Sequence, residues 1–217
     1  MSSSRITLLG VVLFGASQPV GKRDVSAKRA EILEAAAAVF REAGYETASM
    51  DRIAERAGAS KRTVYNHFGS KEALFEAVVA WMMASQAEAK AIPFDPEAGL
   101  ASQLRRFADA KAAYVADEDA RALMRVVLGV AIRRPGYLEE LLDRHASDED
   151  TLVRWLRDAD AAGALDVPEP DVAAGLFWAM AGGALFWPAV AGHTGPVGAS
   201  RLADEIVETF LARFQAS

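Results

Sequence analysis

A short basic and aromatic segment, SKRTVYNHFGSK (residues 60–71), carries side chains suited to binding a polyanion. They are Lys61, Arg62, Thr63, Tyr65, Asn66, His67 and Lys71. Lysine and arginine donate hydrogen bonds to guanine O6 and N7 or to phosphate oxygens, and a threonine methyl can contact the thymine methyl. Hydroxyl, amide and imidazole groups bind phosphate oxygens and fix the register of a protein on a duplex. The chemistry that this segment predicts is recognition of DNA.

The charge of the chain is unevenly distributed. The 217 residues carry a formal net charge of −6. From Lys22 to Lys71, ten Lys and Arg stand against seven Asp and Glu, whereas from Glu72 to the end 13 stand against 23. A locally basic segment in an otherwise acidic chain is typical of a nucleic-acid-binding module attached to a solvated body.

The elements around this segment are predicted to be short helices. Ser26, Ser49, Ser60 and Ser70 each precede an apolar periodic stretch and can cap a helix, and Gly44, Gly58 and Gly69 can end the helices that come before them. The two short helices at 49–57 and 60–68 are joined by a tight turn at residues 57–60, which predicts a helix-turn-helix spanning 49–68. The N-terminal residues of its second helix should then reach base edges in the major groove.

Two residues outside the second helix are also predicted to contact DNA. Ser49 and Lys71 lie at helix starts, where free backbone N–H groups and the helix dipole favour a phosphate. Each side chain alone is open to a plainer interpretation, because Tyr65 and His67 could pack and Lys61 and Arg62 could form a solvated face. The combination with the turn and the charge contrast favours DNA binding.

Residues 28–75 resemble the DNA-binding domain of the tetracycline repressor (TetR/AcrR) family. The resemblance rests on EILEAAAAVFREAGY, on MDRIAERAG and on SKRTVYNHFGSKEAL, which follow one another without a gap. The family pattern usually has two threonines where this chain has Ala48-Ser49, so a hydroxyl cap remains but one phosphate contact is weakened. The resemblance implies a homodimeric repressor that binds a palindromic operator and is released by a small molecule.

The rest of the chain is predicted to be helical, and the fold class all-α: an N-terminal three-helix helix-turn-helix domain followed by a C-terminal helical bundle. Beyond the break at residues 92–96, the patterns predict helices at 97–116, 118–133, 136–145, 148–163, 169–191 and 199–215. The expected domains are 26–86 for DNA binding and 87–217 for ligand binding and dimerisation. Residues 1–25 form an extension, poorly ordered or a misassigned start; its apolar run also resembles a weak signal peptide.

The C-terminal part resembles the AefR-like subgroup of the same family, in the stretches 122–142, 152–165 and 168–186. Its helix at 170–191 is apolar nearly all round, so it must be buried or lie at a subunit interface; a membrane span is disfavoured. Together with the final helix it is predicted to form the dimer interface. An unknown apolar effector is expected to contact the large aromatic side chains and methionine. These candidates are Trp81, Phe107, Met124, Trp155, Phe177 and Trp178.

An enzyme is the main rival class, and the sequence argues against it. The chain has no cysteine, which excludes disulfides, thiolate metal sites and thiol nucleophiles. Its three histidines, His67, His145 and His193, show no metal-binding spacing, and no phosphate-binding loop or nucleophile elbow occurs. We expect no catalytic residue, no metal and no cofactor, and a cytoplasmic location. An activator, or a regulator without a ligand, stays open as an alternative.

Overall fold

The computed structural model describes residues 27–87, 92–137, 139–140, 151–193 and 197–216. The predicted extension 1–25 lies outside these residues, as do most of the predicted helix 136–145 and the start of the one predicted at 148–163. Within the described part every regular element is a helix, and the only β-type contact there is an isolated bridge between Leu165 and Gln215. The predicted all-α class is confirmed.

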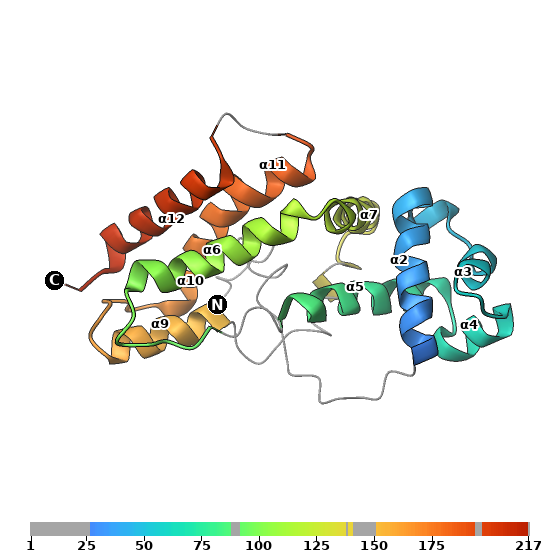
Figure 1. Cartoon of the computed structure of the whole chain (residues 1–217), viewed down its shortest axis with the longest axis horizontal. Helices are drawn as coiled ribbons and strands as arrows, with labels where there is room; N and C mark the ends of the chain where they lie inside the picture. The colour runs from blue at the N-terminus through green and yellow to red at the C-terminus, as the bar shows by residue number, and fades with distance from the viewer. Residues whose placement is uncertain (1–26, 88–91, 138, 141–150, 194–196, 217) are drawn as a thin grey trace. The chain divides into compact units, whose positions relative to one another are not determined.

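The helices form two compact units, which are described separately. One unit contains α2 (Ala27–Thr47), α3 (Met50–Arg56), α4 (Lys61–Phe68), α5 (Lys71–Ala87) and α7 (Glu118–Arg133) (Figure 1). The other contains α6 (Leu100–Ala116), α9 (Thr151–Ala161), α10 (Pro170–Ala181), the π-helix η2 (Gly182–Phe186), α11 (Trp187–Val190) and α12 (Ala199–Phe214). We call them the reading unit and the bundle unit.

The reading unit is built around the apolar face of α2. Ile32, Val39 and Phe40 are fully buried, and the rings of Phe40 and Phe75 meet edge to face with centroids 5.2 Å apart. The helical conformation of α2 ends at Gly44, whose φ of 75° and ψ of 166° suit only glycine. The predicted end at Gly44 is therefore confirmed by the backbone.

The serine caps predicted in this unit are present wherever the structure describes them. The Ser49 and Ser60 side chains accept hydrogen bonds from the N–H groups of Arg52 and Thr63. Ser70 Oγ accepts from Ala73 N at 3.1 Å. Each cap satisfies one of the free N–H groups of its helix and so fixes where that helix begins.

The bundle unit buries an aromatic core between α6, α9, α10 and α12. Trp155, Phe107, Trp178 and Phe177 follow one another in edge-to-face contacts with centroid separations of 5.5–6.2 Å. Gln103 is one of the two polar residues that are buried here among the described residues, the other being Lys111, and its Oε1 accepts from Trp155 Nε1 at 3.1 Å. Its amide also bonds backbone groups of Asp95 and Ala98 and thereby fixes the chain that precedes α6.

The apolar helix predicted at 169–191 is not a uniform α-helix. Between α10 and α11 the five residues of η2 are π-helical, and Trp187 N–H donates to Gly182 O, five residues back. Pro188 explains the change, because it has no N–H and its ring clashes with the carbonyl four residues earlier in an α-helix. The predicted helical stretch is thus present as one continuous helix, Pro170–Val190, with a π turn within it.

Segment Pro170–Val190 is also long and apolar enough to cross a bilayer by length and composition. Half of its apolar window is buried inside the protein, as is usual for a core helix of a globular domain. Its buried residues, including Phe177 and Trp178, belong to the aromatic core of the bundle unit.

Candidate nucleic-acid interface

Helix α4 is anchored by two side chains and presents the rest of its surface to solvent. Val64 and Phe68 are buried, as predicted, and the Arg29 guanidinium lies 4.6 Å from the centre of the Phe68 ring. Lys61 and Arg62, in the first turn of α4, are exposed. A cationic N-terminal turn that faces solvent on a firmly packed helix has the arrangement that entry into the major groove requires.

The turn before α4 is held by a lysine that the sequence did not single out. Lys28 Nζ donates to Ala57 O at 2.9 Å and to Gly58 O at 3.2 Å, and it also pairs with Glu31. Gly58 has a φ of 54°, the left-handed conformation that ends α3. Lys28 lies about 30 residues before the turn, so no local spacing could have revealed this contact.

Lys61 and Arg62 differ in their surroundings. Lys61 Nζ lies 2.9 Å from Asp51 Oδ1, and this hydrogen bond raises the pKa of the lysine. The pair is exposed, so water and salt screen it and a phosphate can compete with Asp51 for the ammonium. Arg62 has no ion-pair partner among the residues described, which leaves its five N–H donors for a base edge or a phosphate.

The remaining predicted contacts on α4 are placed as follows. The Thr63 hydroxyl lies 2.8 Å from Ser60 Oγ, and its methyl group is the part that is predicted to contact a thymine. Tyr65, Asn66 and His67 are exposed on the part of the helix that Val64 and Phe68 leave free. All six predicted side chains from Lys61 to His67 thus belong to one helix, and their contact with DNA remains a prediction.

The two flanking candidates are placed very differently. Ser49 is exposed and caps α3 with its oxygen, which leaves its hydroxyl proton free to donate. Lys71 Nζ instead donates to Tyr45 O, Glu46 O and Ala48 O at 3.0, 3.1 and 3.1 Å, and lies 4.7 Å from the Tyr45 ring centre. Three carbonyls match the three protons of an ammonium, so Lys71 holds the segment that follows Gly44 and leads into α3.

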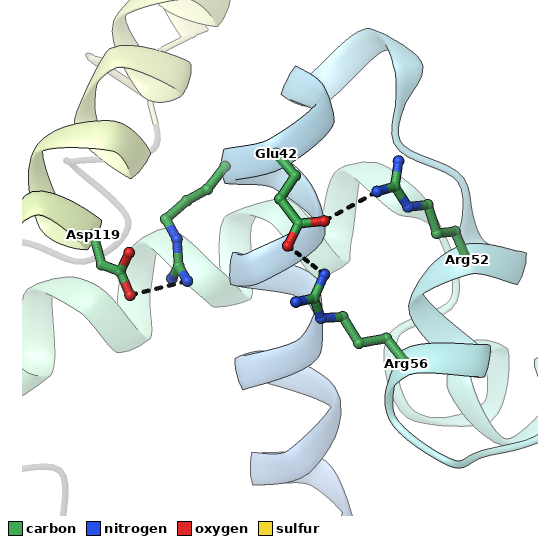
Figure 2. A network of polar contacts seen from close by, with 5 residues as sticks. Glu42, Arg52, Arg56 and Asp119 are labelled. Atoms are coloured by element: carbon green, nitrogen blue, oxygen red, sulfur yellow. Dashed lines mark hydrogen bonds and ion pairs between the residues drawn. The ribbon is translucent and has the colours of Figure 1, made fainter.

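An arginine–carboxylate network joins α2 to α3. Figure 2 shows Glu42 between Arg52 and Arg56, at 3.0 and 2.5 Å. The hydrogen bond from Arg56 is the main cause that lowers the pKa of Glu42. The network is exposed, and its effect is to fix the orientation of α3, against which α4 packs.

Helix α7 packs against α2 within the reading unit, although it follows α6 in the chain. Arg41 on α2 pairs with Asp119 on α7 at 3.0 Å (Figure 2). The Arg134 guanidinium lies 5.5 Å from the Tyr45 ring centre. Burial raises the pKa of Tyr45 to about 12. The sequence grouped α7 with the C-terminal domain; the boundary predicted at residue 86 stays a prediction.

The six candidate ligand contacts are divided between the two units. Phe107, Trp155, Phe177 and Trp178 belong to the aromatic core of the bundle unit. Trp81 and Met124 belong to the reading unit, where Met124 is buried and Trp81 is 40% exposed. The described residues contain no group of three or more His, Cys, Asp or Glu suited to a metal ion.

Helix-turn-helix DNA-binding regulators are defined by two short helices joined by a tight turn, of which the second is cationic and exposed at its first turn. Residues 32–78 match the bacterial regulatory proteins of the tetR family, and residues 102–216 match the C-terminal domain of the AefR-like transcriptional repressors. The chain belongs to the TetR family, within its AefR-like branch, and is a DNA-binding transcriptional regulator.

Individual relatives agree with this assignment. The chain is 30% identical over 149 residues to the transcriptional regulator UidR of Escherichia coli, a match that covers 66% of this chain and 70% of UidR. It is 50% identical over 52 residues to the transcriptional activator FasR of Mycolicibacterium smegmatis, but that match spans only 24% of either chain. A TetR family regulator from Pseudomonas syringae pv. tomato superposes with a TM-score of 0.71 at 33% identity, over 90% of this chain and 100% of that one.

Proposed function

We propose that the protein is a homodimeric repressor in which α4 of each copy reads one half-site of a palindromic operator. The observation that carries this proposal is the exposed first turn of α4, with Lys61 and Arg62 in solvent while Val64 and Phe68 are buried. In this arrangement Lys61, Arg62 and Thr63 face base edges, and Ser49, Tyr65, Asn66 and His67 bind phosphates. Lys71 acts on DNA only indirectly, by holding the segment that leads into α3.

The dimer forms through the segment of α10 that leaves apolar side chains in solvent. Val172 and Leu176 are 52% and 51% exposed and lie one helical turn apart. On α12, by contrast, Ile206, Phe210 and Phe214 are buried in their own bundle unit and would not be seam residues. A two-fold axis through this seam presents two α4 helices to half-sites roughly 34–36 Å apart.

A small molecule in the bundle unit relieves repression, and the chain itself provides a route for the signal. α6 ends at Ala116 and α7 begins at Glu118, so Asp117 alone separates them. α6 carries Phe107 of the aromatic core, and α7 packs on α2 of the reading unit. In this proposal a shift of α6 is passed to the reading unit through Asp117, one of the places where the chain runs between the two units.

No reaction is proposed for this chain. Its relatives are regulators, and the Gln103 amide, which is buried in the bundle core, is occupied by structural hydrogen bonds. We place the protein in the cytoplasm, because an operator is reached there, and we propose that Pro170–Val190 is a bundle helix rather than a membrane span.

The experiment that tests the proposal is selection of DNA fragments from the source genome by the full chain, followed by binding curves for Arg62→Ala. Losing a bidentate guanine contact should weaken operator binding by at least tenfold. Arg154→Ala, which removes an exposed arginine from α9 of the bundle unit, is the control and should bind as wild type does. An operator that overlaps a promoter supports repression, whereas a site well upstream supports activation. If selection enriches no sequence, or if Arg62→Ala binds like wild type, the assignment of α4 is wrong.

A further inference from the structure

An acidic side chain lies beside the exposed first turn of α4. Asp51, in the first turn of α3, has its Oδ1 and Oδ2 at 2.9 and 3.0 Å from Lys61 Nζ. Both side chains are largely in solvent, at 65% and 59% exposure, and Lys61 is the ion-pair partner that the described residues give Asp51. A carboxylate is thus held against the cation that is proposed to meet a base edge.

A carboxylate at a surface that receives a polyanion needs a physical reason. Asp51 repels every phosphate that approaches, so it lowers the affinity of this surface for DNA of any sequence. Its position also favours the dipole of α3, as an acid in the first turn of a helix does. That effect requires no contact with Lys61, and the Ser49 side chain already caps this helix start. The pairing with Lys61 therefore calls for a second explanation.

The pair treats a base edge and a phosphate differently. An ammonium has three protons, so a Lys61 that bonds both Asp51 oxygens keeps one proton for DNA. Guanine O6 and N7 are uncharged acceptors, and Lys61 can donate to one of them while Asp51 stays in place. A phosphate that competes for the ammonium brings a second negative charge close to the carboxylate, and this repulsion opposes the contact.

The neighbouring cations show that this arrangement is particular to Lys61. Arg62, the next residue, has no ion-pair partner among the residues described. Arg52 and Arg56 on α3 pair with Glu42, which joins α3 to α2. Of the Lys and Arg side chains on α3 and α4, Lys61 is the one that the described structure pairs with an acid of the other helix in the helix-turn-helix.

We propose that Asp51 is a positioning residue for sequence readout, which directs the Lys61 ammonium to an uncharged acceptor on a base edge and opposes its contact with phosphate. Specificity is a difference between two affinities, so a repulsive element against the wrong partner raises it just as a new attraction to the right one does. The wrong partner here is DNA of unrelated sequence, which binds through its phosphates. The inference rests on the proposed function, in which α4 enters the major groove.

The test compares two duplexes of equal length by fluorescence anisotropy on the full chain, from about 50 to 200 mM salt. One is the operator recovered by genomic selection, and the other is an alternating A·T duplex. Asp51→Asn should bind the A·T duplex more tightly, with a salt dependence steeper by about 0.9 log–log units for each Lys61 that gains a phosphate. Its gain at 50 mM salt should then be about 3.5-fold larger than at 200 mM, and the ratio of operator to A·T affinity should fall by about threefold or more.

Glu55→Gln is the matched control, because it removes an exposed carboxylate of α3 that has no ion pair among the described residues. It changes the net charge equally and should leave the salt dependence on the A·T duplex near that of wild type. Asp51→Glu, which keeps the charge, should stay closest to wild type. In a Lys61→Met background, Asp51→Asn should change binding no more than Glu55→Gln does, since its effect passes through Lys61.

A purely structural role of Asp51 gives the opposite sign, because a poorly started α3 would bind both duplexes more weakly. Weaker or unchanged binding of Asp51→Asn to the A·T duplex refutes the proposal. So does an equal gain in Glu55→Gln or in the Lys61→Met background. Wild type that binds the selected operator no more tightly than the A·T duplex would instead refute the proposed readout by α4.

A second measurement leaves Asp51 intact and covers the case in which Asp51→Asn does not fold. If Asp51 keeps Lys61 from phosphates, Lys61→Met should lower operator affinity while the salt dependence on the A·T duplex stays that of wild type. A salt dependence flatter by about 0.9 units on the A·T duplex would show that Lys61 binds phosphate in spite of Asp51, and would overturn the proposal.

Discussion

Replacing Lys71 by methionine separates a structural role from a DNA-binding role. The sequence alone predicts that Lys71 contacts a phosphate, in which case its loss would weaken binding to all DNA and flatten the salt dependence by about one log–log unit. The structure gives its ammonium three backbone acceptors on Tyr45, Glu46 and Ala48. If those bonds dominate, Lys71→Met should first of all lower stability.

The size of the loss follows from these contacts. A hydrogen bond from a charged donor contributes about 1.5–3 kcal/mol. A partly exposed cation–π contact adds about 0.5–1 kcal/mol. One ammonium serves all three carbonyls, so the terms do not add fully. We expect a loss of about 2–3 kcal/mol in the free energy of unfolding, or about 4–12 °C in Tm if the chain unfolds cooperatively.

Urea and thermal unfolding, followed by circular dichroism, measure this loss, and operator binding is then measured well below the melting temperature. Lys61→Met is the matched control, because Lys61 makes an exposed ion pair on the neighbouring helix. It should weaken DNA binding and leave stability nearly unchanged. A Lys71→Met protein as stable as wild type, whose salt dependence is flatter by one unit, would show that Lys71 is a phosphate ligand after all and that its carbonyl contacts contribute little.

Three further outcomes are expected. Glu42→Gln should destabilise the protein at neutral pH but not in acid. The Arg56 hydrogen bond lowers the pKa of Glu42 below its ordinary value of 4.5, so the ionised carboxylate stabilises the fold above pH 4.5 and loses that effect as the pH falls through the lowered pKa. Unfolding curves from pH 3 to 7 would check this. Gly44→Ala should cost about 1–3 kcal/mol in the free energy of unfolding, since its backbone conformation is one that almost only glycine adopts; an unchanged denaturation midpoint would contradict this. Leu176→Glu places a charge on the exposed apolar face of α10 and should convert dimers to monomers in sedimentation runs while operator affinity falls at least tenfold; a stable dimer would move the interface elsewhere.

The reading unit could be predicted closely because its determinants are local. Ser49, Ser60 and Ser70 each accept a hydrogen bond from an N–H group three residues ahead, and Gly44 and Gly58 have the positive φ expected of helix ends. Such signals act within one helical turn, so they are legible in a single sequence. These caps fix where α4 begins, and Val64 and Phe68 mark its buried face. The exposure of the first turn of α4 could therefore be predicted.

Contacts between distant residues could not be predicted in the same way. Lys28 and Lys71 reach backbone carbonyls 29–30 and 23–26 residues away, and a lysine that caps another helix has the same local pattern as one that faces solvent. The π-helix has a local cause in Pro188, but a proline in an apolar run equally predicts a kink or a helix end. Composition marked Trp81 and Met124 as ligand contacts as strongly as Phe107, and only the fold separates them.

The burial of Lys111 could not be predicted from its neighbours in the sequence. In the sequence it follows Arg105, Arg106 and Asp109 on one helix, and a charged residue in such company is normally solvated. Arg105 indeed pairs with Asp109 and with Asp204 on α12, which fixes α6 against the last helix, while Lys111 turns inward to the rings.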